Sequence, residues 1–139
     1  MEKTLVIKWG TSRGRDTYGY TTCNLYVDGK RVASCNGGGY DMQGTVIGEY
    51  IQNAYREELK KLPSNRGSLD KNPGYYGLSF WWKGEHHHTY QEGDNISLDG
   101  ACGVSSMIRI IEAIGLRLYK IHSSKKEDIW TLTDRPKEA

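Results

Sequence analysis

The stretch TTCNLYVDGKRVASC (residues 21–35) contains two segments rich in apolar residues, separated by Asp28 and Gly29. An Asp-Gly pair accepts the positive φ angles of a type I′ turn, so the two segments are predicted to form a β-hairpin. In a regular hairpin Leu25 then lies opposite Val32. The hairpin indicates that the fold is built on an antiparallel sheet.

The segments on either side of this hairpin add further strands and two helices. Residues 45–62 and 101–114 carry apolar residues at helical spacing. Asp99 is the expected N-cap of the second helix, and Gly115 suits the left-handed position that follows it. The polar stretch 83–95 is predicted to be irregular. The remaining predicted strands cover residues 4–10, 75–82, 116–122 and 128–133.

The predicted elements define a single α+β domain with a mostly antiparallel sheet and two helices. The chain has 139 residues, which is the size of one domain. We place that domain at residues 1–134 and expect residues 135–139 to form a frayed tail.

The composition limits the possible functions. The net charge is only +2, which is far from the basic excess of a general nucleic-acid binder. No run approaches the 18 apolar residues of a membrane span. Three cysteines without a CxxC motif, and an N-terminal apolar patch too short for a signal peptide, favour a cytoplasmic protein. The apolar fraction of 37% is low, which favours stabilisation by a homo-oligomer.

Two glycine-containing loops are candidate ligand-binding segments. The loop after the first strand contains Arg13, whose guanidinium suits a phosphate group. The loop CNGGGYDMQG (residues 35–44) contains Gly37, Gly38 and Asp41 and precedes a helix, where backbone N–H groups can bind an anion. The alternative for both loops is an ordinary solvated turn.

The second helix has a polar face opposite its apolar one. Ser105, Ser106 and Arg109 lie on this face, with Ser105 and Arg109 one turn apart. They are candidate ligand-binding residues. The alternative is a solvent-facing stripe in which Arg109 pairs with Glu112.

Trp81 and Trp82 end the ring-rich segment YYGLSFWW (residues 75–82). Successive strand residues point to opposite faces, so at most one ring packs in the core and the other faces solvent, a pocket or a partner. An exposed Trp beside basic groups is suited to stacking on a base.

Catalysis and metal binding have weaker support. His86, His87 and His88 have no partner ligands at a recognised spacing, so we predict no metal site and no cofactor. No set of nucleophile, base and orienting group is evident, so we predict no catalytic residues.

Three strings together resemble a family of small phage proteins. They are WGTSRGRDTYGY (residues 9–20), CNGGGYDMQGTVIG (residues 35–48) and LDGACGVSSMIRIIEAIGL (residues 98–116). The chain resembles the first-described Thoeris anti-defence family, whose members sequester cyclic ADP-ribose isomers made by bacterial TIR proteins. The resemblance covers about residues 5–121.

The resemblance implies a non-enzymatic sponge that encloses its ligand at a dimer interface and assembles into dimers or dimer-based hexamers. It implies an adenine-stacking ring at Trp82, a polar loop residue at Asn95, and arginine contacts from Arg56 and Arg109. It also implies a second site for cyclic di- or trinucleotides in some members. The run of three histidines departs from the family pattern, which puts the alignment around Asn95 in doubt.

Two other functions remain open at the level of sequence. One is a small nucleic-acid-binding phage protein, supported by exposed aromatics and arginine-bearing loops. The other is a phosphodiesterase that degrades the same signals, using His87 or His122.

Overall fold

The structure is a computed structural model that describes residues 1–13, 19–37, 42–61, 75–82, 85–92, 95–97 and 103–136. Its elements follow the order β-β-β-α-α-β-β-β-α-β-β. Their bounds are β1 (Glu2–Arg13), β2 (Gly19–Val27), β3 (Lys30–Gly37), α1 (Met42–Ala54), α2 (Arg56–Lys60), β4 (Tyr75–Trp82), β5 (Glu85–Glu92), β6 (Asn95–Ser97), α3 (Val104–Ala113), β7 (Leu116–Ser123) and β8 (Glu127–Asp134).

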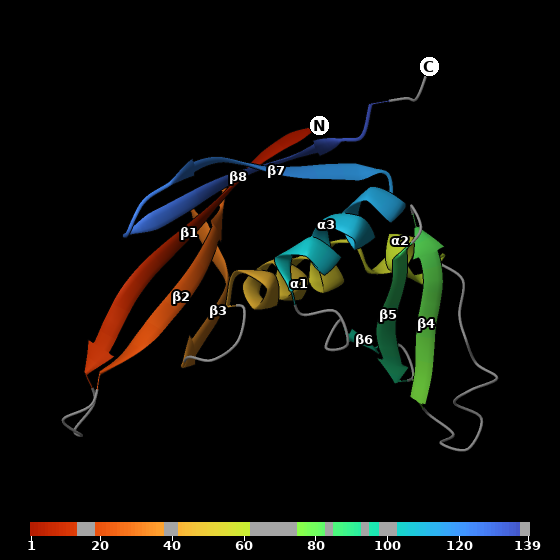
Figure 1. Ribbon diagram of the computed structural model, residues 1–139, viewed down its shortest axis with the longest axis horizontal. Helices are drawn as coiled ribbons and strands as arrows, with labels where there is room; N and C mark the ends of the chain where they lie inside the picture. Colours follow the sequence, from red (N-terminus) through yellow and green to blue (C-terminus); the bar gives the residue numbers. More distant parts are fainter. Residues whose placement is uncertain are drawn as a thin grey trace.

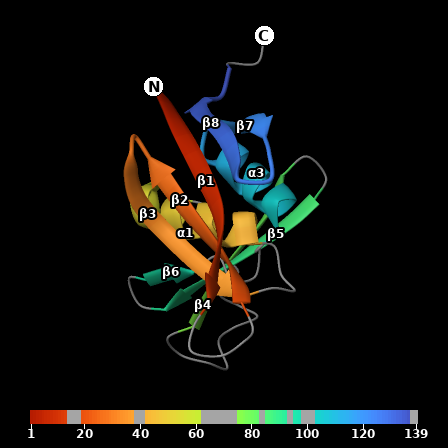
Figure 2. The same cartoon turned by 90° about the vertical axis from the view of Figure 1, so that its left-hand side faces the viewer.

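Two antiparallel sheets frame the molecule. The larger sheet has five strands in the order β3-β2-β1-β8-β7, and the smaller has three in the order β4-β5-β6. Helices α1 and α3 lie on one face of the larger sheet, between it and the smaller sheet (Figure 1). The view from the side shows the same layering (Figure 2). The prediction of a single α+β domain with a mostly antiparallel sheet is confirmed.

The hairpin that led to this prediction has the expected turn and one irregularity. Asp28 and Gly29 have φ angles of 51° and 82°, as a type I′ turn requires. The predicted pairing of Leu25 with Val32 is wrong, because Leu25 lies opposite Ala33. The register shifts between Leu25 and Tyr26, where Val32 of β3 is an extra residue without an opposite partner in β2. From Leu25 back to Thr21, each β2 residue therefore lies opposite a β3 residue one position later than in a regular hairpin.

The core lies between the larger sheet and its helices. Inward-facing strand residues alternate with outward ones, as a sheet covered on one face requires. Residues without any exposed surface come from both layers and include Leu5, Ile7, Leu25, Val46, Ile47, Ile51, Leu59, Met107, Ile110, Ile111 and Leu132.

The predicted helix over residues 45–62 is in fact two helices. Helix α1 ends at Ala54, and Tyr55 leaves the helical conformation with φ −124° and ψ 34°. The short α2 follows in a new direction, and its Leu59 is completely buried. Burial of Leu59 against the core therefore accompanies the break, which helical spacing alone does not reveal.

Helix α3 begins later than predicted. Its N-cap is Gly103, without a side-chain cap, so Asp99 is not the N-cap. Its C-terminal end follows the prediction, because Gly115 has a φ of 88°. Such an angle is strained for any residue with a Cβ atom, which explains glycine at this position.

The polar stretch predicted to be irregular forms strands instead. Residues 85–92 are β5, which pairs with β4 along its whole length, and β6 begins at Asn95. His86 lies opposite Trp81 in this ladder. Backbone pairing with the ring-rich β4 outweighs the low strand propensity of the β5 sequence.

The chain just after β8 is held against the helical layer. The backbone N–H of Arg135 donates to the carbonyl oxygen of Gly115 across 3.0 Å. This bond fixes the first residue of the segment that the sequence assigns to a tail. Within the described residues, no helix is both long and apolar enough to cross a membrane.

Candidate functional site

The predicted loop residues Arg13 and Gly37 come from neighbouring strand ends. Arg13 ends β1 opposite Gly19, and Gly37 ends β3 opposite Thr21. Because Gly19 and Thr21 are two residues apart on β2, both loops emerge from the same end of the larger sheet (Figure 1). Gly38 and Asp41 lie outside the described residues.

Trp82 and Asn95 lie at opposite ends of the smaller sheet. Trp82 pairs with Glu85 at the start of β5, and Asn95 pairs with Glu92 at its end. Glu92 lies seven positions after Glu85 along an extended strand, which corresponds to about 23 Å at roughly 3.3 Å per residue. One protomer therefore does not bring these two backbone positions together.

The other predicted residues are carried by α2 and α3. Arg56 begins α2, which contacts β6, and its Nη2 donates to Asn53 Oδ1 across 3.5 Å. Ser105 is exposed on α3 and Arg109 is half-buried one turn later, while the backbone of Ser106 lies in the same first turn. Since α3 contacts β5, the two helices place Arg56 and Arg109 on elements that border the smaller sheet.

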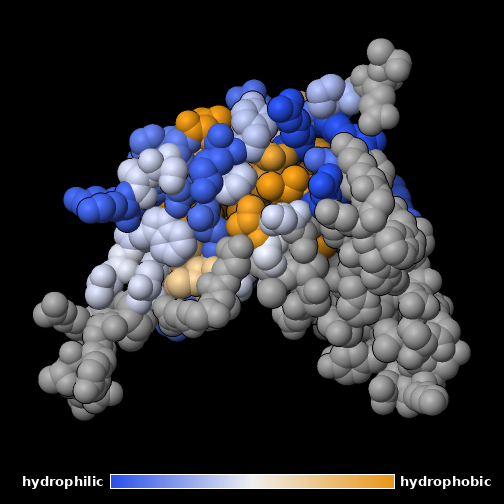
Figure 3. Space-filling view, in the orientation of Figure 1, coloured by the Kyte–Doolittle hydropathy of each residue, from blue (hydrophilic) through white to orange (hydrophobic). Residues whose placement is uncertain are grey.

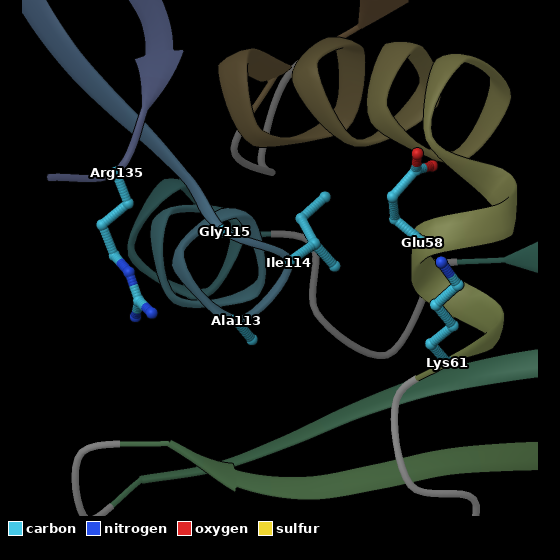
Figure 4. Close-up of a pocket in the computed structure, with 6 residues that line it drawn as sticks. All are labelled: Glu58, Lys61, Ala113, Ile114, Gly115 and Arg135. Carbon is cyan, nitrogen blue, oxygen red and sulfur yellow. The ribbon is translucent and has the colours of Figure 1, made fainter. Parts of the chain in front are cut away.

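A cavity of about 400 Å³ lies at the C-terminal end of α3. Its volume falls within the range of about 300–1,000 Å³ that is usual for small-molecule sites. The residues that line it, among those described, are Glu58, Lys61, Ala113, Ile114, Gly115 and Arg135. The close-up shows Arg135 on one side of the end of α3 and the α2 residues on the other, with the β4–β5 hairpin running alongside (Figure 4).

The charges of the cavity are asymmetric. Two cations, Lys61 and Arg135, lie with one carboxylate, Glu58, around an apolar wall formed by Ala113 and Ile114. Glu58 and Lys61 are exposed, whereas Arg135 is half-buried. Among the candidates whose side chains are described, Arg56, Ser105 and Arg109 do not line this cavity. The sequence around Arg135, which was predicted to begin a frayed tail, contains no pattern that indicates a place in a cavity.

A second polar cluster surrounds the buried carboxylate of Asp128, which is 4% exposed. Its oxygens accept from Trp9 Nε1 across 2.6 Å and from Ser123 Oγ across 2.5 Å, and Lys120 Nζ lies 3.6 Å away. Burial raises the pKa of Asp128, but the hydrogen bonds from Ser123 and Trp9 and the charge of Lys120 outweigh it. The pKa of Asp128 is therefore below its ordinary value of 3.8.

The Lys120 side chain also links this cluster to Trp130. Its Nζ lies 5.0 Å from the centre of the Trp130 ring, and Trp130 Nε1 donates to Gln43 Oε1 across 3.0 Å. The network joins β7, β8 and the first turn of α1. Its donors and acceptors are paired with one another, which is typical of a structural cluster.

A third cluster joins the first strand to the break between α1 and α2. Lys3 Nζ donates to Tyr50 Oη across 3.3 Å and lies 5.6 Å from the centre of the Tyr55 ring. The hydrogen bond to Tyr50 raises the pKa of Lys3, and burial raises the pKa of Tyr55. Lys3 is therefore cationic and Tyr55 neutral at physiological pH, so neither suits proton transfer there.

Metal-binding residues do not gather in the part of the chain that is described: no three His, Cys, Asp or Glu side chains are grouped for a metal ion there. His86, His87 and His88 belong to β5 by backbone pairing.

The exposed surface is divided between polar and apolar areas. Arg117, Lys125 and Lys126 are exposed on β7 and the turn after it, next to the exposed Tyr119 and Ile121. Arg117 lies 4.8 Å from the centre of the Tyr119 ring. Hydrophobic residues gather below the sheet in the middle of the face shown in Figure 3.

Comparison with known proteins gives no match: no family model, no curated protein and no solved structure is significantly similar to this chain. The function is therefore argued from the residues and their arrangement.

Proposed function

We propose that this protein is a phage anti-defence sponge that binds cyclic ADP-ribose isomers without cleaving them. The observation that carries the proposal is the cavity at the end of α3, which has two cations and an apolar wall. The end of α3 lies at the same end of the molecule as the end of β4 (Figure 1), and the last residue of β4 is Trp82. An aromatic ring, cations and a cavity of this size suit a ligand with a base and phosphates.

We infer a site shared between protomers from the distance between Trp82 and Asn95 along the smaller sheet. If Trp82 and Asn95 contact one small ligand, as the family resemblance implies, two protomers supply them. Val104 and Ile108 of α3 pack against the core but keep part of their surface exposed near the exposed Ser105, and this exposed part suits contact with a second copy. Sedimentation velocity is expected to show at least a dimer at micromolar concentration, whereas a 15.8 kDa species would contradict this assembly.

Sequestration in the cytoplasm of the infected cell is the expected mode of action. Enclosure in a preformed pocket lowers the rate of ligand release more than it raises the rate of capture. No cofactor is required for this activity, and cyclic di- or trinucleotides are candidate ligands of a further site.

The direct test is capture and release. Purified protein is incubated with TIR-derived signal, separated from free signal by filtration, heat-denatured and analysed by mass spectrometry. Recovery of intact cyclic ADP-ribose isomer supports the sponge. Recovery of a linear product identifies a phosphodiesterase instead, and no recovered nucleotide contradicts the proposal.

The basic surface of β7 favours a second candidate function, nucleic-acid binding. Arg117 is exposed beside the Tyr119 ring, and Lys125 and Lys126 are exposed in the turn after β7, which suits a single-stranded backbone with a stacked base. Binding to a phosphate backbone weakens steeply as salt increases. Oligonucleotide titrations at increasing salt distinguish this function from small-ligand capture.

A further inference from the structure

We infer that Cys23 and Cys35 are a thiol pair that forms a reversible disulfide when the protein meets a low-molecular-weight disulfide such as glutathione disulfide. The two residues lie opposite one another on β2 and β3. The proposed function uses neither of them, so the inference stands whether or not the protein is a sponge.

The bulge in the β2–β3 hairpin brings the two cysteines face to face. Without the bulge, Cys23 would lie opposite Ser34, and the side chain of Cys35 would point to the other face of the sheet. The extra residue Val32 shifts the register by one position, so Cys23 lies directly opposite Cys35. Bulges of this kind redirect side chains, and here the effect is to align two thiols.

Both cysteines lie on the face of the larger sheet that packs against the helices. Cys23 is completely buried in the core, and Cys35 packs against the core while part of its surface stays exposed. The Cα atoms of directly opposite residues in an antiparallel ladder are about 4.5–5.5 Å apart. A disulfide requires a Cα separation of roughly 4.4–6.8 Å. The hairpin backbone therefore has the spacing that a disulfide between these two residues needs.

The different exposure of the two thiols sets the order of the reaction. The Cys35 thiolate attacks one sulfur of glutathione disulfide, which forms a mixed disulfide and releases one glutathione. The Cys23 thiolate then attacks the Cys35 sulfur, and the second glutathione leaves. Two protein thiols are oxidised to one disulfide, and the two protons that they lose are taken up by the two glutathione thiolates. Excess dithiothreitol reverses both steps.

Oxidation also changes a contact at the start of α1. Cys35 Sγ donates to the carbonyl oxygen of Met42 across 3.7 Å, and Met42 is the first residue of α1. A sulfur in a disulfide has no hydrogen to donate, so oxidation removes this hydrogen bond. The disulfide therefore strengthens the link between β2 and β3 at the expense of the link between β3 and α1. Cys35 lies two positions before Gly37, so both changes occur next to a predicted ligand loop.

The test follows the mass of the folded protein after treatment with glutathione disulfide. The chain has three cysteines, and Cys102→Ser leaves Cys23 and Cys35 as its only thiols. The reaction is quenched with acid, and the protein is analysed by mass spectrometry without reductant. We expect the chain to lose the mass of two hydrogen atoms and peptide mapping to join residues 23 and 35. If Cys102→Ser does not fold, peptide mapping of the unaltered protein gives the same answer.

Two matched variants in the same background test the order of attack. In Cys23→Ala, the mixed disulfide with glutathione should persist on Cys35, because the second thiol is missing. In Cys35→Ala, Cys23 should react at least about tenfold more slowly than Cys35 does in the first variant, since a completely buried thiol reacts only after local opening. Thermal melting under reducing conditions establishes that each variant is folded.

The outcomes decide the inference in either direction. Loss of two hydrogen atoms within one chain, reversed by dithiothreitol, supports it. A folded pair that keeps both thiols under conditions that oxidise the urea-unfolded chain overturns it. A pair that accumulates two glutathione adducts, or a disulfide that joins two chains, also overturns it.

Discussion

The indole N–H of Trp9 donates to the carboxylate of Asp128 across 2.6 Å, and this bond ties β1 to β8 where the two strands separate. The last pair in their ladder is Lys8 with Glu127. Beyond it, the backbone N–H of Trp9 still donates to the Lys126 carbonyl oxygen across 2.8 Å, and β1 continues in its pairing with β2 to Arg13. Asp128 also accepts from Ser123, so one buried carboxylate fixes three strands.

Replacing this carboxylate should destabilise the fold. The two carboxylate oxygens of Asp128 each accept a hydrogen bond, one from Trp9 and one from Ser123. In Asp128→Asn, an NH₂ group replaces one of these oxygens and cannot accept its hydrogen bond. We expect a loss of about 1–3 kcal/mol in the free energy of unfolding at neutral pH, measured by urea denaturation. The matched control is Asp134→Asn in the same strand, because the Asp134 carboxylate is 64% exposed. Its replacement should lower the free energy of unfolding by less than about 1 kcal/mol. Equal losses in both variants would show that the buried carboxylate of Asp128 stabilises the fold no more than the exposed carboxylate of Asp134.

The stability difference between the unaltered protein and Asp128→Asn should also depend on pH. The pKa of Asp128 is lowered in the folded state, so its ionised form stabilises the fold above the unfolded pKa near 3.8. That contribution is lost as the pH falls through the lower folded pKa. The stability difference between the unaltered protein and Asp128→Asn should therefore be constant near neutral pH and shrink below about pH 4. A difference that does not change down to pH 2 contradicts a stabilising ionised Asp128.

Gly115 offers a test of backbone strain. Its φ is 88°, and a Cβ atom added there meets no atom within 4 Å. Gly115→Ala should therefore cost about 1 kcal/mol through conformation alone, without a steric clash. Gly115→Asn should cost less, because Asn tolerates the left-handed region. Thermal melting of both variants checks this order, and an Asn variant less stable than the Ala variant would contradict it.

Much of the fold could be predicted because local chemistry determines it. Asp28 and Gly29 specify their turn through positive φ angles, and Gly115 ends α3 for the same reason. The register beyond Leu25 could not be predicted, since the bulge depends on packing across the sheet. Likewise, β5 is polar and becomes a strand through its pairing with β4.

The site was less predictable than the fold. The sequence indicated residue types that bind phosphates, and it placed Arg56 and Arg109 on helices. It did not indicate Arg135, because that residue reaches the cavity through a backbone bond to Gly115, 20 positions earlier in the chain. Contacts of this kind leave no periodic pattern in the sequence.

Trp82 is the residue that we expect to stack on a base. Trp82→Ala should reduce the affinity for an adenine-containing ligand about 5- to 150-fold, since stacking on one base contributes roughly 1–3 kcal/mol. Trp81→Ala is the matched comparison, because neighbouring strand residues face opposite sides. Calorimetry and melting temperature are measured for both. Unchanged affinity with a large loss of melting temperature in Trp82→Ala would assign the core position to Trp82 and the ligand to Trp81.

Arg109 tests whether α3 contacts the ligand. It is half-buried one turn after the exposed Ser105, whereas Ile110 and Ile111 beside it are completely buried. If Arg109 binds a phosphate through two N–H groups, Arg109→Ala should weaken ligand binding by roughly 1.5–3 kcal/mol. Arg109→Lys should then restore only part of that loss, because an ammonium cannot reproduce the planar guanidinium.

The alternative for Arg109 makes a different prediction for the same variants. If the guanidinium only supplies charge near the site, Arg109→Lys should restore most of the binding. If it pairs with Glu112 on the surface of α3, neither variant should alter the affinity for ADP-ribose, cyclic ADP-ribose or a cyclic oligonucleotide. Calorimetry with these three ligands distinguishes the outcomes, and Glu112→Gln is the control that removes the pairing without removing the arginine. An unaltered affinity in all of these variants would show that the Arg109 face of α3 does not contact the ligand.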